Sequence, residues 1–196
     1  MMPLPVQADW AVELGSDDET LEVPWAAPDH GPRYLDLKRQ PELLPEIEEA
    51  RRERELGEFL AAINSASILE TAKCDVWASA EIKPEEEIFG AACKFGSYVD
   101  LFFSDERRFS FSDQEQLAKR LTQLLQRVPE IPAAAEFLVR RCHFHEEGTR
   151  DGFYITFYLF GYGDEEPQAR RQWAIGLKLV ENAIRQISAG NNPVQP

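Results

Sequence analysis

Two stretches of similar sequence constrain the fold of this chain most strongly. Residues 96–103 and 152–159 each begin with glycine, place a tyrosine two positions later and continue through β-branched and aromatic residues. Residues of these types favour strands, and each stretch leads towards a segment with the apolar spacing of a helix. The pattern predicts a duplicated strand–strand–helix unit. Two independent strands of similar composition are the alternative, because the same residues favour any strand.

Apolar spacing and turn residues predict the remaining elements. Strands are expected at 68–79, 91–104, 135–146 and 152–161, with a further short strand at 107–111. Helices are expected at 45–64, 112–128 and 167–190, the second with a capping box of Ser112 and Glu115. The sequence therefore predicts an α+β fold, with a twisted antiparallel sheet of four to five strands and helices packed on one face.

The first 45 residues are rich in proline and acidic residues, but they are too apolar for a plain disordered tail. Trp10 and Trp25 are suited to anchor this segment on a core, and Pro24 excludes a central strand at its position. We expect three parts: an extended acidic arm at 1–45 packed on the domain, a single α+β domain at 46–190, and a C-terminal tail at 191–196.

The charge balance limits the expected partners. Among 196 residues, 35 acidic residues outnumber 21 lysines and arginines, which gives a formal net charge of −14. Such a surface repels nucleic-acid phosphate and anionic lipid, so neither nucleic acid nor membrane is an expected partner. Three cysteines without a CxxC spacing fit reduced thiols, and the chain does not open with a secretory signal pattern. We therefore predict a cytoplasmic protein.

Strand alternation assigns side chains to two sheet faces. One face is expected to form the core against the helices, with Val99, Leu101, Phe103, Ile155, Phe157, Leu159, Cys74, Val76, Leu138, Cys142 and Phe144. The opposite face is expected to carry Trp77, Tyr98, Asp100, Phe102, Arg141, His143, His145, Tyr154 and Tyr158. A mixture of aromatic rings and charges is typical of a binding surface or a subunit interface.

The function depends on what covers this aromatic–polar face. The N-terminal arm or a second copy of the chain is the expected cover, ahead of a ligand groove, because apolar sheet faces are usually covered by protein. We therefore predict a non-enzymatic module that binds a protein partner through this face, with a homodimer as one form of that partnership.

An enzyme with its site on the same face is the alternative. His143 and His145 alternate onto one side of a strand, where Asp75 or Asp100 would have to complete a metal site or an acid–base pair. Cys142 beside His143 does not form a catalytic pair, because neighbours on a strand point to opposite faces. No phosphate-binding loop is present, and no cofactor is predicted.

Overall fold

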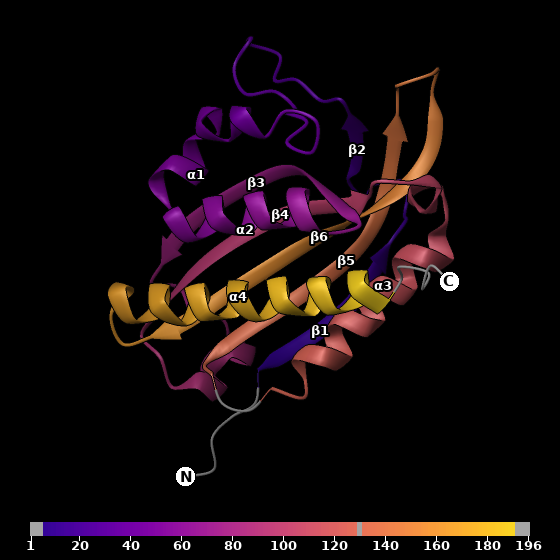
Figure 1. Cartoon of the computed structure of the whole chain (residues 1–196). Coiled ribbons are helices and arrows are strands. Elements are labelled where there is room, and N and C mark those ends of the chain that lie inside the picture. Colours follow the sequence, from indigo (N-terminus) through magenta and orange to yellow (C-terminus); the bar gives the residue numbers. More distant parts are fainter. Residues whose placement is uncertain (1–5, 129–130, 191–196) are drawn as a thin grey trace.

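The computed structural model describes residues 6–128 and 131–190 and contains a six-stranded sheet. The strands are β1 (Gln7–Glu13), β2 (Thr20–Val23), β3 (Leu69–Ser79), β4 (Cys93–Phe103), β5 (Ala133–Phe144) and β6 (Arg150–Gly163). The helices are α1 (Glu48–Arg52), α2 (Arg54–Ala66), α3 (Phe111–Leu125) and α4 (Glu166–Gly190), with 3-10 turns η1 (Pro41–Glu46), η2 (Pro84–Phe89) and η3 (Glu106–Phe109). Figure 1 shows α2, α3 and α4 lying across the sheet.

The sheet is mixed, and this corrects the predicted antiparallel sheet of four to five strands. Its order is β1-β5-β6-β4-β3, and β2 pairs with β5 as well. β1 and β2 both run parallel to β5, whereas the pairs β3–β4, β4–β6 and β5–β6 are antiparallel. The two additional strands come from the N-terminal segment, which joins the edge of the sheet. The division into arm, domain and tail remains a prediction, and residues 191–196 lie outside the described residues.

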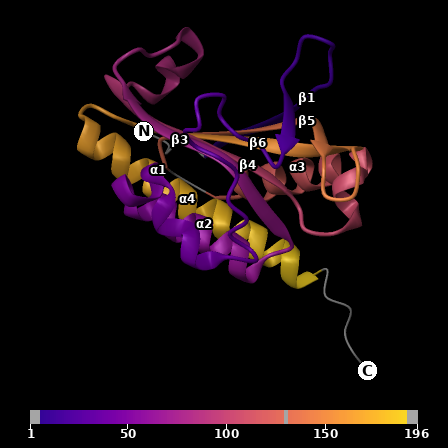
Figure 2. The same ribbon diagram turned by 90° about the horizontal axis from the view of Figure 1, so that it is seen from above.

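The helices cover one face of the sheet and form the main core with it (Figure 2). The close approach of α4 to β6 depends on Gly161, since a Cβ there would lie 2.2 Å from the Trp173 backbone nitrogen. Trp173 is fully buried, and its Nε1 donates a hydrogen bond to Ser97 Oγ at 2.8 Å. None of the helices in the described residues is long and apolar enough to cross a membrane.

Three local predictions need correction. The helix expected at 45–64 is divided into η1, α1 and α2, because Ile47 and Glu53 have extended backbone angles. The buried Glu53 carboxylate pairs with the partly exposed Arg170 of α4. α3 is capped by Ser110, whose Oγ accepts a hydrogen bond from the Asp113 amide at 3.2 Å, and not by Ser112. The strand expected at 107–111 is instead the 3-10 turn η3 and the start of α3.

The order strand, strand, helix occurs twice, as β3-β4-α3 and β5-β6-α4. The predicted faces of β4 and β6 are confirmed: Val99 and Ile155 belong to the core against the helices. In β5 the assignment is wrong, because Cys142 and Phe144 belong to a second apolar cluster, with Phe102 and Tyr154. Leu138 alternates with them on that side, while Phe137 and Val139 face the helices. A duplication of the unit remains a prediction.

Candidate functional site

The sheet face opposite the helices is divided into two halves by the N-terminal segment. Over one half, the side chains of β2 and the following loop close a second apolar cluster. We call this the covered half; it contains Asp100, Phe102, Cys142, Phe144 and Tyr154. The rest, which we call the open half, carries the half-buried rings of Trp77, Tyr98, Tyr158 and Phe160. Figure 2 shows loops standing above this face on both sides, with the helices below the sheet.

The covered half is completed by residues from other parts of the chain. Arg108 lies over the rings of Phe102 and Phe144, at 5.2 and 5.1 Å from their centroids. Its guanidinium also lies 3.5 Å from a carboxylate oxygen of Glu70, and both charged residues are buried. Leu21, Val23, Trp25 and Tyr34 add the apolar cover from the N-terminal segment. Phe102 and Tyr154 are consequently 0% exposed.

Asp100 lies within the covered half and is 2% exposed. It accepts a hydrogen bond from Thr156 Oγ1 at 2.8 Å, and Arg140 donates to the same hydroxyl at 3.0 Å. Burial raises the pKa of the Asp100 carboxyl to about 7, although the Thr156 hydrogen bond acts in the opposite direction. Arg140 is held in turn by the carboxylate of Glu13 in β1 at 2.7 Å. Tyr154 lies nearby and is 0% exposed, and burial raises the pKa of its hydroxyl.

The open half contains a row of aromatic and acidic residues that crosses five strands. Tyr98 and Tyr158 are direct cross-strand partners on β4 and β6, with ring centroids 5.9 Å apart. The register continues this row to Asp75 on β3 in one direction, and to Glu136 on β5 and Asp9 on β1 in the other. We call these five residues the Tyr–acid row. Two phenol rings are therefore flanked by carboxylates on both sides.

The carboxylates of this row have no ion-pair partner among residues 6–128 and 131–190. Asp75 and Asp9 each accept a hydrogen bond from the amide of the following residue. Burial, together with the negative charges of Glu13 and Asp9, raises the pKa of Glu136. The row thus places carboxylates without ion-pair partners beside half-buried aromatic rings.

A second pair of rings closes one side of the row. Trp77 contacts Phe160 edge to face at a centroid distance of 5.8 Å, and Phe160 lies over Gly96, where any Cβ would meet the ring at 2.5 Å. Lys94 stands 4.9 Å from the Phe160 centroid and 2.8 Å from the Glu86 carboxylate of η2. A groove of about 440 Å³ adjoins these rings and reaches Tyr158 and Glu136. The open half is therefore a hollowed surface and not a flat one.

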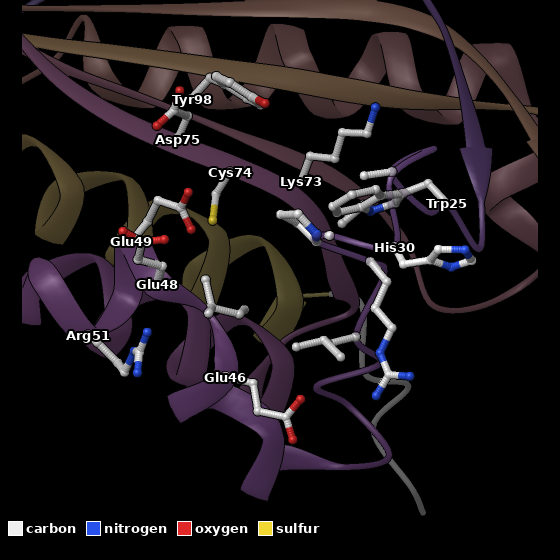
Figure 3. Close-up of a pocket in the computed structure, with 17 residues that line it drawn as sticks. Trp25, His30, Glu46, Glu48, Glu49, Arg51, Lys73, Cys74, Asp75 and Tyr98 are labelled. Atoms are coloured by element: carbon white, nitrogen blue, oxygen red, sulfur yellow. The ribbon is translucent and has the colours of Figure 1, made fainter.

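The other side of the row opens into a groove of about 800 Å³ at the edge strand β3 (Figure 3). Tyr98 and Asp75 lie at one end of this groove and Glu46 at the other. Side chains already occupy part of the strand edge: Arg52 donates to the Val76 carbonyl at 3.0 Å and Lys38 to the Leu69 carbonyl at 3.1 Å. Such capping is typical of edge strands that are protected against further strand pairing. The edge groove is therefore less suited than the open half to a partner.

Cys74 is the thiol that lines this edge groove. Burial raises the pKa of Cys74 to about 12, and the charge of Glu49 acts in the same direction. A thiol that stays protonated at neutral pH is a poor nucleophile. The groove therefore offers no activated cysteine for covalent chemistry.

The structure separates the predicted histidines from the aromatic residues. His143 is paired with Asp151 across β5 and β6, and its Nδ1 lies 3.0 Å from Glu22 of β2. Both His143 and Arg141 alternate with Cys142, so they belong to the opposite side of the sheet from Tyr154. His145 also contacts Glu22, at the exposed end of β5. Within residues 6–128 and 131–190, no group of three or more histidine, cysteine or acidic side chains is arranged to hold a metal ion.

Of the predicted site residues, the structure brings Trp77, Tyr98, Asp100, Phe102, Tyr154 and Tyr158 onto one face. Phe102, Tyr154 and Asp100 are covered, whereas the other three stay accessible. The sequence interpretation missed Glu136, Phe160 and Arg140. Phe160 continues the alternation of Tyr154 and Tyr158 by one step and was within reach of sequence reasoning.

Comparisons with known proteins give no relative for this chain. No protein-family model matches it, and neither curated proteins nor solved structures show significant similarity.

Proposed function

We propose that this protein is a non-enzymatic binding module whose protein partner docks on the open half of the sheet face. The proposal rests on one observation: the N-terminal segment covers one half of this face and leaves the neighbouring half uncovered. The N-terminal segment buries Phe102 and Tyr154 completely, while Tyr98, Tyr158 and Trp77 on the same face stay half-buried. Amphipathic aromatic rings in a hollowed, polar-rimmed surface are typical of the centre of a protein interface.

A homodimer through this face remains a second prediction, but charge disfavours it. In a symmetric dimer each patch meets its own copy, so two Tyr–acid rows would bring like charges together. In the described part of the chain Asp75, Glu136 and Asp9 form no ion pair, and the charges of Lys83 and Arg140 offset that of Glu136 only in part. A heterologous partner fits better, and sedimentation velocity of the purified chain distinguishes the two.

Site-specific photo-crosslinking in the cells that make this protein tests the proposal. A p-benzoylphenylalanine is placed at position 158 in the open half or, as a control, at position 175 on α4, where Ile175 is 44% exposed. We expect a discrete crosslinked protein from position 158 but not from position 175, and its loss when Trp77→Ser is added. The same products from both positions would contradict docking on the open half.

An enzymatic role for Asp100 is the second candidate, because a buried carboxyl with a pKa of about 7 is suited to proton transfer. Arg140 and Thr156 are the polar groups beside it. The predicted His143 lies on the other side of the sheet, and Asp100 is 2% exposed. Substrate would reach Asp100 only after the N-terminal segment had moved, so we place this candidate second.

A further inference from the structure

The sheet face opposite the helices pairs cations, aromatic rings and carboxylates at two places within the chain itself. In the covered half, Arg108 contacts the Phe102 ring and the Glu70 carboxylate. At the opposite end of the face, Lys94 stands over Phe160 and binds Glu86. A cation over a ring face is attracted by the electron density of the ring, and a carboxylate beside it adds a charge-assisted hydrogen bond.

The Tyr–acid row lies between these two sites and has the rings and the carboxylates but no cation. Among the described residues, no lysine or arginine stands over Tyr98 or Tyr158 or forms an ion pair with Asp75 or Glu136. Lys83 lines the adjoining groove, and its charge lowers the pKa of Glu136. Burial and the charges of Glu13 and Asp9 raise that pKa by more. Arg140 acts on Glu136 and Tyr158 through its charge, but its guanidinium binds Glu13. The row therefore lacks a cation in contact with its rings.

We infer that the Tyr–acid row binds an arginine-bearing segment of the partner protein, whose guanidinium stacks on Tyr98 or Tyr158 and pairs with the carboxylate next to that ring, Asp75 or Glu136. Arginine fits better than lysine because its planar guanidinium stacks on aromatic rings and donates two parallel hydrogen bonds to a carboxylate. This inference deepens the proposed function, on which it rests, and names the chemistry of the partner. The net charge of −14 adds long-range attraction for a basic segment.

The inference is tested by titrating the ¹⁵N-labelled full chain with short acetylated peptides and following backbone amide shifts. The probe peptide carries two arginines among serines and glycines; matched peptides carry glutamine or leucine in their place. We expect shifts at Tyr98, Tyr158 and Glu136 with the arginine peptide alone, weakening as salt rises. Asp75→Asn combined with Glu136→Gln should weaken binding about tenfold. The matched control, Glu58→Gln with Asp151→Asn, changes the net charge equally and should bind like wild type.

Four results would overturn the inference. If both double variants bind the arginine peptide equally weakly, the peptide is attracted by the net charge of the chain and not by the Tyr–acid row. Binding of free arginine amide as tight as that of the peptide would point to a small organic cation. If no peptide changes the amide shifts of the Tyr–acid row, the row is not a cation site. Binding of the leucine peptide to the same residues, with an affinity equal to that of the arginine peptide, would also overturn the inference. The proposed docking face would then remain, and the crosslink from position 158 tests that face independently.

Discussion

The covered and open halves of the sheet face are made of similar residues, yet the chain completes only one of them. Around Phe102 it supplies a cation from η3, a carboxylate from β3 and an apolar cover from the N-terminal segment. Around Tyr98 and Tyr158 it supplies carboxylates, but no cover and no cation in contact with the rings. Aromatic content therefore does not mark a binding surface by itself. The open half differs from the covered half because the described part of the chain gives it neither an apolar cover nor a cation over its rings.

The largest effect is expected from truncating a ring of the covered half. Phe102→Ala should lower the free energy of unfolding by about 3–5 kcal/mol, because it removes a fully buried ring from a packed cluster. Urea denaturation of the purified chain measures this loss. Phe102→Leu, the control, keeps most of the volume and should lose less. A loss below about 1 kcal/mol for Phe102→Ala would mean that the N-terminal segment does not cover this half in solution.

The next prediction concerns the carboxyl that lies beneath this cover. The pKa of Asp100 is raised from 3.8 to about 7 in the folded chain, so its protonated form stabilises the fold at low pH. That contribution is complete below about pH 4 and is lost as pH rises through 7. Asp100→Asn should therefore gain stability relative to wild type between pH 4 and 8, by up to about 4 kcal/mol. Paired urea titrations across this range measure the difference, and a difference that does not change with pH contradicts the prediction.

The smallest stability effect is expected in the open half. Tyr158→Ala removes a half-buried ring and its contact with Tyr98, so the free energy of unfolding should fall by only about 1 kcal/mol. The same variant should abolish partner crosslinking from a probe at position 98. A stability loss as large as that of Phe102→Ala would show that Tyr158 is a core residue, and the distinction between the halves would fail.

The sequence allows the faces of β4 and β6 to be predicted because their apolar and polar residues alternate strictly. β5 does not allow the same prediction, since Phe137, Leu138 and Val139 are all apolar and the strand is buried on both faces at these three positions. The N-terminal segment is predicted as an extended arm, but its place in the sheet was missed for a different reason. Their parallel pairing with β5 joins Trp10 to Phe137 across more than a hundred residues, and no local pattern encodes that contact.

The candidate site was predictable only in part for a related reason. Alternation places Tyr98, Asp100 and Tyr158 on one face but does not determine which residues stand side by side. The Tyr–acid row depends on the register of five strands, which brings Asp75 and Glu136 to opposite ends of the tyrosine pair. The cover over Phe102 depends on the path of the N-terminal segment. Both are tertiary features that a single strand does not reveal.

Hydroxyl-radical footprinting tests the central claim most directly, by comparing the purified chain with the same chain inside the cells that make it. In the purified chain, Trp77, Tyr98 and Tyr158 should be oxidised readily, whereas Phe102 and Tyr154 should be protected. Inside the cell, the partner should protect the first three as well, while Ile175 on α4 stays reactive. Equal protection of both halves in the purified chain, or full reactivity of the open half inside the cell, would contradict docking on the open half.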